Sequence, residues 1–154
     1  MECLKELDID SRDIRLIEKL YWEQEAAVRI DDTLSKFQYI KRGVRQGCVL
    51  SPDLFSVYTE KIMRNIQNMP GIFINGHVIN NLRYADDTAL IASNENDLQI
   101  LLNTVVAESK KMGLTMNEKK TVTMVASRKV NEPTCGIMMN DTKLKQVERF
   151  KYLG

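Results

Sequence analysis

Apolar residues recur at helical spacing in three parts of the chain, and each part begins at a residue suited to an N-cap. Ser11 precedes the first part, with Asp10 as the alternative cap, Ser51 precedes the second, and Ser93 or Asn94 precedes the third. The core-facing positions are Ile14, Ile17, Leu20 and Tyr21, then Leu54, Phe55, Tyr58, Ile62 and Ile66, then Leu98, Leu101, Leu102 and Val105. The pattern predicts three amphipathic helices whose apolar stripes belong to a core.

Turn residues between short apolar runs predict hairpins. The turns lie at 31–33, 75–76 and 140–141. They join residues 26–30 to 36–40, 72–74 to 78–79, and 137–139 to 144–147. Residues 121–125 predict a further strand, Gly113 suits the left-handed end of the third helix, and residues 127–133 suit an exposed loop. The fold class is therefore α+β, with an antiparallel sheet and helices packed on one face.

Two adjacent carboxylates interrupt an apolar, strand-like stretch. Residues 83–91 read Arg-Tyr-Ala-Asp-Asp-Thr-Ala-Leu-Ile. Burying two unpaired charges together is costly, so we expect a tight turn between strands 82–85 and 88–92 with Asp86 and Asp87 at its tip. Paired carboxylates on a rigid turn suit a two-metal phosphoryl-transfer site, and Mg²⁺ prefers such oxygen ligands. An ordinary Asp-Asp surface turn is the alternative.

A second motif lies upstream. Residues 43–52 read Gly-Val-Arg-Gln-Gly-Cys-Val-Leu-Ser-Pro, where Ser51 and Pro52 suit the N-cap and the first position of a helix. Followed by Tyr-Ala-Asp-Asp in this order and spacing, the segment resembles the palm domain of reverse transcriptases. The residues of this motif are most similar to those of the same motif in enzymes of non-LTR (LINE-type) retrotransposons.

The resemblance extends over residues 1–154. Residues 113–121 resemble the next palm motif, and residues 134–154 resemble the start of the primer-grip region. The family's other catalytic aspartate lies in a Phe-x-x-Asp motif, which does not precede Arg45 here. The upstream candidates by residue type are Asp8, Asp10, Asp13, Asp31 and Asp32. We therefore expect an incomplete palm, without its first catalytic strand, the fingers or the thumb.

The resemblance implies an RNA-directed DNA polymerase, a nucleotidyltransferase acting on an RNA template, a DNA primer and dNTPs. It assigns Asp86 and Asp87 as ligands of Mg²⁺, with Mn²⁺ possible as a substitute, and Lys120, or else Lys119, as the lysine near the triphosphate. The expected nucleic-acid or substrate contacts are Arg45, Gln46, Gly47, Tyr84, Ala85, Phe150, Tyr152, Leu153 and Gly154. The isolated chain is expected to be inactive.

Composition limits the remaining possibilities. The net charge is +1, but residues 110–154 hold ten Lys/Arg against four Asp/Glu, so a basic C-terminal third could approach a nucleic-acid backbone. Cys3, Cys48, Cys135 and the single His77 lack zinc-ligand or disulfide spacing. No signal peptide or membrane-spanning run is evident. These features predict an intracellular protein without membrane partners, in either the nucleus or the cytoplasm.

Two other functions stay open at the level of sequence. One is a decayed or repurposed remnant that binds nucleic acid or protein without catalysis. The other is an RNA-directed RNA polymerase, although those enzymes usually carry Gly rather than Ala before Asp-Asp. Because a palm without its first catalytic strand would leave an apolar strand edge unpaired, self-association of the chain is also expected.

Overall fold

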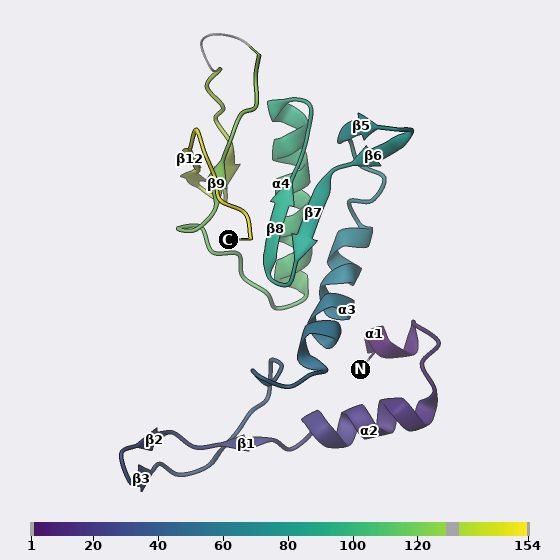
Figure 1. Ribbon diagram of the computed structural model, residues 1–154, viewed down its shortest axis with the longest axis vertical. Coiled ribbons are helices and arrows are strands. Elements are labelled where there is room, and N and C mark those ends of the chain that lie inside the picture. The colour runs from purple at the N-terminus through teal and green to yellow at the C-terminus, as the bar shows by residue number, and fades with distance from the viewer. Residues whose placement is uncertain (1, 129–132, 154) are drawn as a thin grey trace. The chain divides into compact units, whose positions relative to one another are not determined.

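The computed structural model describes residues 2–128 and 133–153 (Figure 1). The chain divides into two compact units, residues 1–59 and residues 60–154, with the boundary inside helix α3 (Ser51–Arg64). The predicted loop at 127–133 is exposed at its described ends, whereas residues 129–132, like Gly154, lie outside the described residues. Within the described part, no helix is long and apolar enough to cross a membrane.

The first unit contains two helices and a long hairpin. Helix α1 spans Glu2–Lys5 and α2 spans Ser11–Tyr21, where the Asp10 side chain accepts a 2.7 Å hydrogen bond from the Arg12 N–H as N-cap. The predicted hairpin is confirmed in two short pieces. Strand β1 (Glu25–Ala26) pairs with β4 (Gln38–Tyr39), and β2 (Arg29–Ile30) pairs with β3 (Thr33–Leu34). All eight strand residues are exposed.

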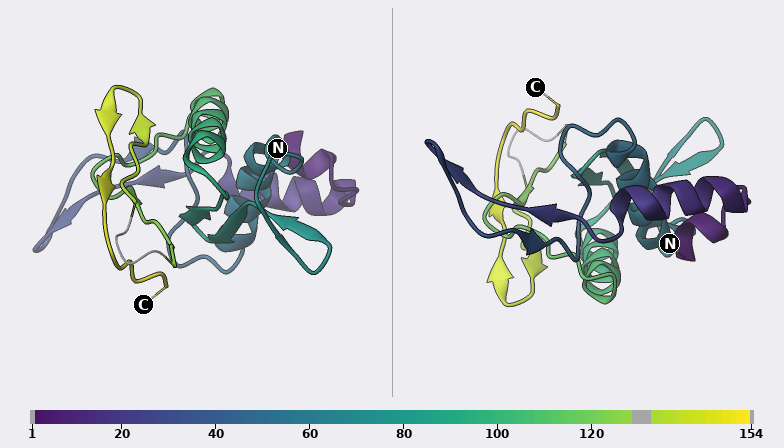
Figure 2. Two further views of the ribbon diagram at one scale, coloured as in Figure 1. Left: turned by 90° about the horizontal axis from the view of Figure 1, so that it is seen from above. Right: turned by 90° about the horizontal axis from the view of Figure 1, so that it is seen from below.

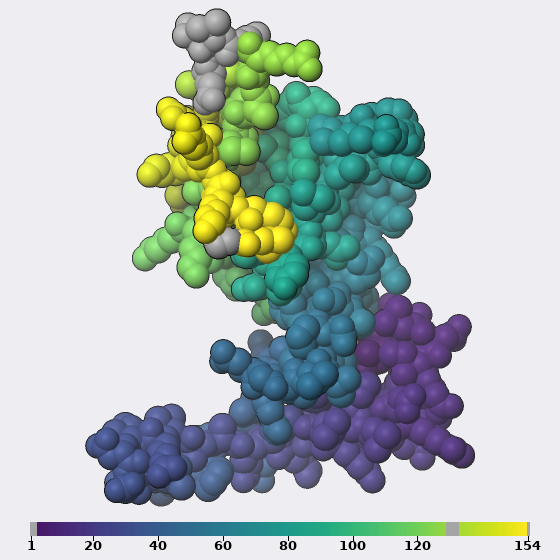
Figure 3. Space-filling view, viewed as in Figure 1, coloured from purple at the N-terminus to yellow at the C-terminus, as the bar shows by residue number. Residues whose placement is uncertain are grey.

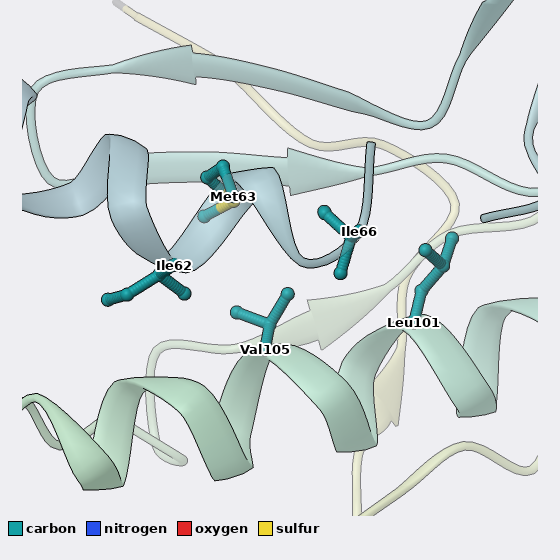
Figure 4. Packing of buried hydrophobic residues seen from close by; sticks show 5 residues of the cluster. All are labelled: Ile62, Met63, Ile66, Leu101 and Val105. Atoms are coloured by element: carbon teal, nitrogen blue, oxygen red, sulfur yellow. The ribbon is translucent and has the colours of Figure 1, made fainter. Parts of the chain in front are cut away.

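The core of the second unit forms between the end of α3 and α4 (Glu95–Lys111). Figure 4 shows Ile62 and Ile66 pointing toward Val105 and Leu101. Of the predicted stripes, Ile62, Ile66, Leu101, Leu102 and Val105 are confirmed as core, whereas Leu54, Phe55 and Tyr58 are only partly buried. Burying each of the core side chains contributes about 1.5–3 kcal/mol. A second cluster joins α4 to the last hairpin and consists of Leu102, Cys135, Ile137, Met139 and Leu144.

Both ends of α4 follow the sequence prediction. The Asn94 side chain accepts a 2.9 Å hydrogen bond from the Asp97 N–H as N-cap. At the other end Gly113 has a φ of +73°, and the Leu114 N–H donates to the Ser109 carbonyl at 2.8 Å. This is a Schellman motif, which a residue with a Cβ atom adopts less readily than glycine.

The strands of the second unit form separate two-stranded pairs. Strand β5 (Ile72–Ile74) pairs with β6 (His77–Ile79), β7 (Asn81–Tyr84) with β8 (Asp87–Leu90), and β10 (Met138–Met139) with β11 (Thr142–Lys143), all antiparallel. Figure 2 shows the β5–β6 hairpin projecting away from α4. The mixture of helices and small, mostly antiparallel sheets confirms the predicted α+β class.

Three features of the predicted sheet are wrong. The described strands form separate two-stranded pairs rather than one antiparallel sheet. Strands β9 (Val122–Thr123) and β12 (Lys145–Gln146) pair in parallel, not antiparallel. Residues 145–147 were expected to continue the last hairpin, but they leave it after Leu144, which is buried in the second cluster. The Val147 N–H then donates to the Thr123 carbonyl at 2.8 Å. Burial of Leu144 turns the chain toward β9.

Candidate active site

The two adjacent aspartates lie at the end of the β7–β8 hairpin. Tyr84 pairs with Asp87, so Ala85 and Asp86 alone form the two-residue turn. The sequence had placed both acids in the turn, whereas Asp87 is the first residue of β8. Ala85 has a φ of +50°. Positive φ at the first central residue is typical of a type II′ turn, a position that glycine normally occupies.

The two faces of this hairpin differ. Leu90 packs against both hydrophobic clusters, and on the same face Arg83 forms a 2.8 Å ion pair with Glu60 of α3. Because side chains alternate along a strand, Tyr84 and Asp87 lie on the opposite face. Tyr84 is 64% exposed there. The inner face therefore anchors the hairpin on the helices, while the outer face presents Tyr84 and Asp87 to solvent.

The carboxylates of Asp86 and Asp87 are both exposed. Within residues 2–128 and 133–153, neither forms an ion pair and no group of three or more potential metal ligands is present. Two hard oxygen donors on adjacent residues nevertheless suit Mg²⁺, which commonly binds proteins through one or two carboxylates and takes its other ligands from water and substrate phosphates. The two carboxylates therefore suit a divalent cation that keeps water or substrate as further ligands, not a cation coordinated by protein alone.

The C-terminal segment reaches this hairpin. The Tyr152 hydroxyl donates to the backbone carbonyl of Asp87 at 3.4 Å, and Figure 3 shows the C-terminal residues in yellow next to the β7–β8 hairpin. Phe150 and Leu153 are exposed, and residues 147–153 contain no strand. Of the predicted primer-contacting residues, Tyr152 thus contacts the backbone of Asp87 rather than its carboxylate. Gly154 lies outside the described residues.

The predicted triphosphate lysine lies in a turn after α4. The Asn117 side chain accepts hydrogen bonds from the Lys119 N–H at 3.1 Å and the Lys120 N–H at 3.2 Å. Glu118 accepts a hydrogen bond from the Thr142 hydroxyl at 3.4 Å, which ties the turn to the β10–β11 hairpin. Both lysine side chains are exposed. The backbone of the turn is held by these hydrogen bonds, and Lys119 and Lys120 are both exposed candidates for the triphosphate lysine.

The Gln-Gly motif belongs to the first unit. Arg45, Gln46 and Gly47 are all exposed, and Gly47 has a φ of +82° with open space where a Cβ would lie. Ser51 does not act as the predicted N-cap, because it is the first residue of α3 and its hydroxyl donates to the Arg45 carbonyl at 2.5 Å. The Leu50 carbonyl instead accepts the first helical hydrogen bond. Ser51 thus holds the motif loop closed.

Tyr21 is a neighbour of this motif that sequence spacing did not reveal. Its hydroxyl lies 2.9 Å from the Ser51 hydroxyl and donates to the Cys48 sulfur at 3.2 Å. A hydrogen bond donated to sulfur favours the thiolate, so this contact lowers the pKa of Cys48 and raises the pKa of Tyr21. Cys48 thus takes part in the hydrogen bonding that supports the loop.

Asn80 is a second residue that the sequence analysis missed. It is only 4% exposed, and its side-chain amide donates to the Ile66 carbonyl at 2.6 Å and the Met69 carbonyl at 3.1 Å. The backbone carbonyl of Asn80 accepts a 2.8 Å hydrogen bond from the Ile91 N–H. Asn80 therefore fastens the base of the β7–β8 hairpin to the chain that follows α3. An apolar-to-polar change just before a strand was the only available signal.

Comparison with known proteins places this geometry in a family. The sequence model for reverse transcriptase (RNA-dependent DNA polymerase) matches residues 1–154. The chain belongs to the reverse transcriptase family. Its relatives include the Retrovirus-related Pol polyprotein from the type-1 retrotransposable element R2 of Nasonia vitripennis, 31% identical over 82% of this chain, and that of Popillia japonica, 36% identical over 75%. The RNA-directed DNA polymerase from mobile element jockey of Drosophila funebris is 28% identical over 88%.

These relatives place the reverse transcriptase domain among those of non-LTR retrotransposon polymerases, as the motif wording indicated. The matched part covers 13%, 17% and 15% of the three relatives, so the chain spans less than a fifth of their length. The names of the family and of the jockey relative agree with the RNA-directed DNA polymerase interpretation. The interpretation as a non-catalytic remnant gains no support from them.

Proposed function

We propose that residues 1–154 are a palm portion of an RNA-directed DNA polymerase from a non-LTR retrotransposon, with residues 134–154 at the start of the primer grip. In the proposed reaction the 3′-hydroxyl of a DNA primer attacks the α-phosphate of a dNTP selected by an RNA template, and pyrophosphate leaves. The observation that carries the proposal is the adjacent, exposed pair Asp86 and Asp87 on a hairpin anchored to α3 and α4.

Asp86 and Asp87 are the proposed ligands of Mg²⁺, for which Mn²⁺ can substitute. When bound, such cations activate the attacking oxygen and stabilise the leaving one. The protein's own contribution is to hold two carboxylates on a turn whose inner face is fixed by Leu90 and the Arg83–Glu60 ion pair. No third carboxylate joins the pair among the described residues. The 154-residue chain alone is therefore expected not to extend a primer.

The remaining residues are proposed to position substrates. Tyr84 and Ala85 would lie beneath the primer end, and Arg45, Gln46 and Gly47 would contact the template or the nascent base pair. Lys120, or Lys119, would stabilise the leaving pyrophosphate. Tyr152 would support Asp87 through the 3.4 Å hydrogen bond to its carbonyl as well as contact the primer with its neighbours. The proposed primer-contacting residues are Phe150, Tyr152, Leu153 and Gly154.

A chimaeric polymerase tests the proposal. This chain would replace the matching segment of the Nasonia vitripennis R2 polyprotein, with which it shares 31% identity. The chimaera should extend a DNA primer on an RNA template with Mg²⁺, and Asp86→Asn should abolish extension. Asp141→Asn is the matched control, because Asp141 occupies the second position of the two-residue turn between β10 and β11 and is also exposed.

Loss of activity in both variants, or in neither, would refute the assignment of Asp86. If the unaltered chimaera fails to extend a primer although it is folded by circular dichroism and gel filtration, the catalytic role of the chain itself is refuted. Metal binding by the chain can be measured without the chimaera.

A further inference from the structure

The hairpin built by β1–β4 carries two exposed aromatic rings, Tyr39 in β4 and Phe37 directly before it. Phe37 is 62% and Tyr39 is 65% exposed. Residues two positions apart in an extended segment lie about 7 Å apart, so the two exposed rings are close neighbours along the chain. Figure 1 shows this hairpin extending from the end of α2. We call residues 24–45 the aromatic arm.

The arm does not cover these rings itself. Tyr39 pairs across the hairpin with Glu25, and Gln38 pairs with Ala26, so no bulky apolar side chain lies opposite either residue of β4. Ile30 and Leu34 near the tip are also exposed. A two-stranded ribbon without a packed face is marginally stable in water. The arm is therefore suited to binding a partner that covers its rings.

The charges on the arm indicate which partner. Residues 33–45 contain Lys36, Lys41, Arg42 and Arg45 and no acidic residue. In the described part of the chain, none of these four cations forms an ion pair. The acids at the tip are partly matched, since Asp32 lies 3.8 Å from Arg29. Glu25 is the acidic residue beside the rings. The charged residues of the segment that bears the rings, residues 33–45, are thus all cationic.

Three kinds of partner can be compared. An apolar protein surface would bury unpaired lysine and arginine side chains, which is unfavourable. A second copy of the arm would bring like charges together. Single-stranded nucleic acid offers phosphates to the cations and unpaired bases to the rings. We propose that residues 33–45 bind single-stranded nucleic acid without sequence preference, with bases stacked on Phe37 and Tyr39 and phosphates neutralised by Lys36, Lys41 and Arg42.

This binding is separate from the polymerase chemistry proposed above, because it needs neither Asp86 nor a metal ion. It can be measured by fluorescence anisotropy on the whole chain with labelled oligo(U) RNA and oligo(dT) of about twelve nucleotides, within the usual site size. Phe37→Leu and Tyr39→Leu should each weaken binding about tenfold. Phe73→Leu is the matched control, since Phe73 is 74% exposed on the β5–β6 hairpin. It should bind as the unaltered chain does.

Salt dependence tests the cationic part. Replacing Lys41 and Arg42 by Gln should lower the slope of log K against log salt concentration by about 1.4 for single strands. Glu25→Gln should strengthen binding, because it removes the anion beside Tyr39. Amide resonances of residues 33–42 should shift when oligo(U) is added, and they also report whether each variant is folded.

Four results would overturn the proposal. The first is unchanged binding by Phe37→Leu and Tyr39→Leu, and the second is an equal loss of oligo(U) affinity in Phe73→Leu. The third is equally tight binding of a duplex, whose paired bases cannot stack on the rings. The fourth is a dimer that forms without nucleic acid and that both arm variants abolish. The last result would show that the arm binds a second copy. Loss of metal binding in Asp86→Asn with normal oligo(U) binding would separate this proposal from the polymerase proposal.

Discussion

At the scale of single residues, the most informative position is Ala85. It is the first central residue of the turn that carries Asp86, and its φ of +50° lies in the left-handed region. A non-glycine residue there costs about 1–2 kcal/mol. Such strain is often found where a turn has to hold functional groups. Glycine would relieve the strain, but it would also raise the conformational entropy of the unfolded chain.

We expect Ala85→Gly to raise the melting temperature by about 2–4 °C, because relief of about 1 kcal/mol shifts the transition of a domain of this size by that amount. Gly76→Ala makes the reverse change at a φ of +84°, with no atom within 4 Å of the new Cβ. It should lower the melting temperature. Scanning calorimetry of both variants checks the prediction, and shifts of the same sign would contradict it.

The cysteines are expected to differ in reactivity. The Tyr21 hydrogen bond lowers the pKa of Cys48, whereas burial raises the pKa of Cys135. Only the thiolate is alkylated, so Cys48 should react faster with iodoacetamide near pH 7.5, and Tyr21→Phe should slow it. Because the pKa of Cys135 is raised by folding, its contribution to stability is present below the pKa of the unfolded thiol and decreases as the pH rises above it. Mass spectrometry of timed samples measures the rates, and faster alkylation of Cys135 would contradict this prediction.

At the scale of elements, the β7–β8 hairpin is held from both ends. Asn80 fastens its base to the chain after α3, and Tyr152 contacts the Asp87 carbonyl at its tip. Leu90 between them packs into both hydrophobic clusters. The position of the carboxylates therefore depends on uncharged residues that lie far apart in sequence as well as on the Arg83–Glu60 ion pair.

Asn80→Ala should lower the free energy of unfolding by about 1–3 kcal/mol, because it removes two hydrogen bonds that the buried Asn80 side chain donates to the Ile66 and Met69 carbonyls. Hydrogen exchange of the amides at 82–90 should also accelerate. Asn96→Ala, at an exposed position on α4, is the control and should have little effect on either. Equal losses in the two variants would show that Asn80 has no special role.

Local patterns explain which elements were predicted correctly. Caps and turn residues such as Asn94, Gly113 and Asn75-Gly76 act within a few positions, so the sequence alone predicts the helix and hairpin that they define. The parallel β9–β12 pair depends on burial of Leu144 more than twenty residues after β9, which no local pattern encodes. Ser51 is a residue type typical of an N-cap, but its hydroxyl donates a hydrogen bond to the Arg45 carbonyl instead. In the site, adjacency revealed Asp86 and Asp87, whereas Tyr21 and Asn80 act through distant contacts.

At the scale of the molecule, every sheet in the described residues has two strands. Each such pair leaves backbone groups unpaired at both edges, a known route to association. Several exposed apolar side chains of the second unit lie on the β5–β6 and β7–β8 hairpins, among them Phe73, Ile74, Val78 and Leu82. These features support the self-association expected from the sequence.

We expect concentration-dependent association in sedimentation velocity, and Phe73→Ser combined with Leu82→Ser should reduce it by removing exposed apolar area. Phe37→Ser on the aromatic arm serves as the comparison and should have a smaller effect. A single monomeric species at all concentrations, with the amides at 82–90 strongly protected, would contradict the prediction and show that the chain closes its own edges.

Divalent-metal binding at the β7–β8 hairpin tests the central claim most directly. In a titration of the chain with Mg²⁺, followed by Mn²⁺ broadening of amide resonances, the signals of residues 84–88 should change first. The affinity should be weak, about millimolar, because two carboxylates supply few of the ligands that Mg²⁺ requires. Asp86→Asn should abolish the effect and Asp141→Asn should preserve it. Broadening centred elsewhere, or unchanged in Asp86→Asn, would contradict the assignment of this hairpin as the metal-binding site.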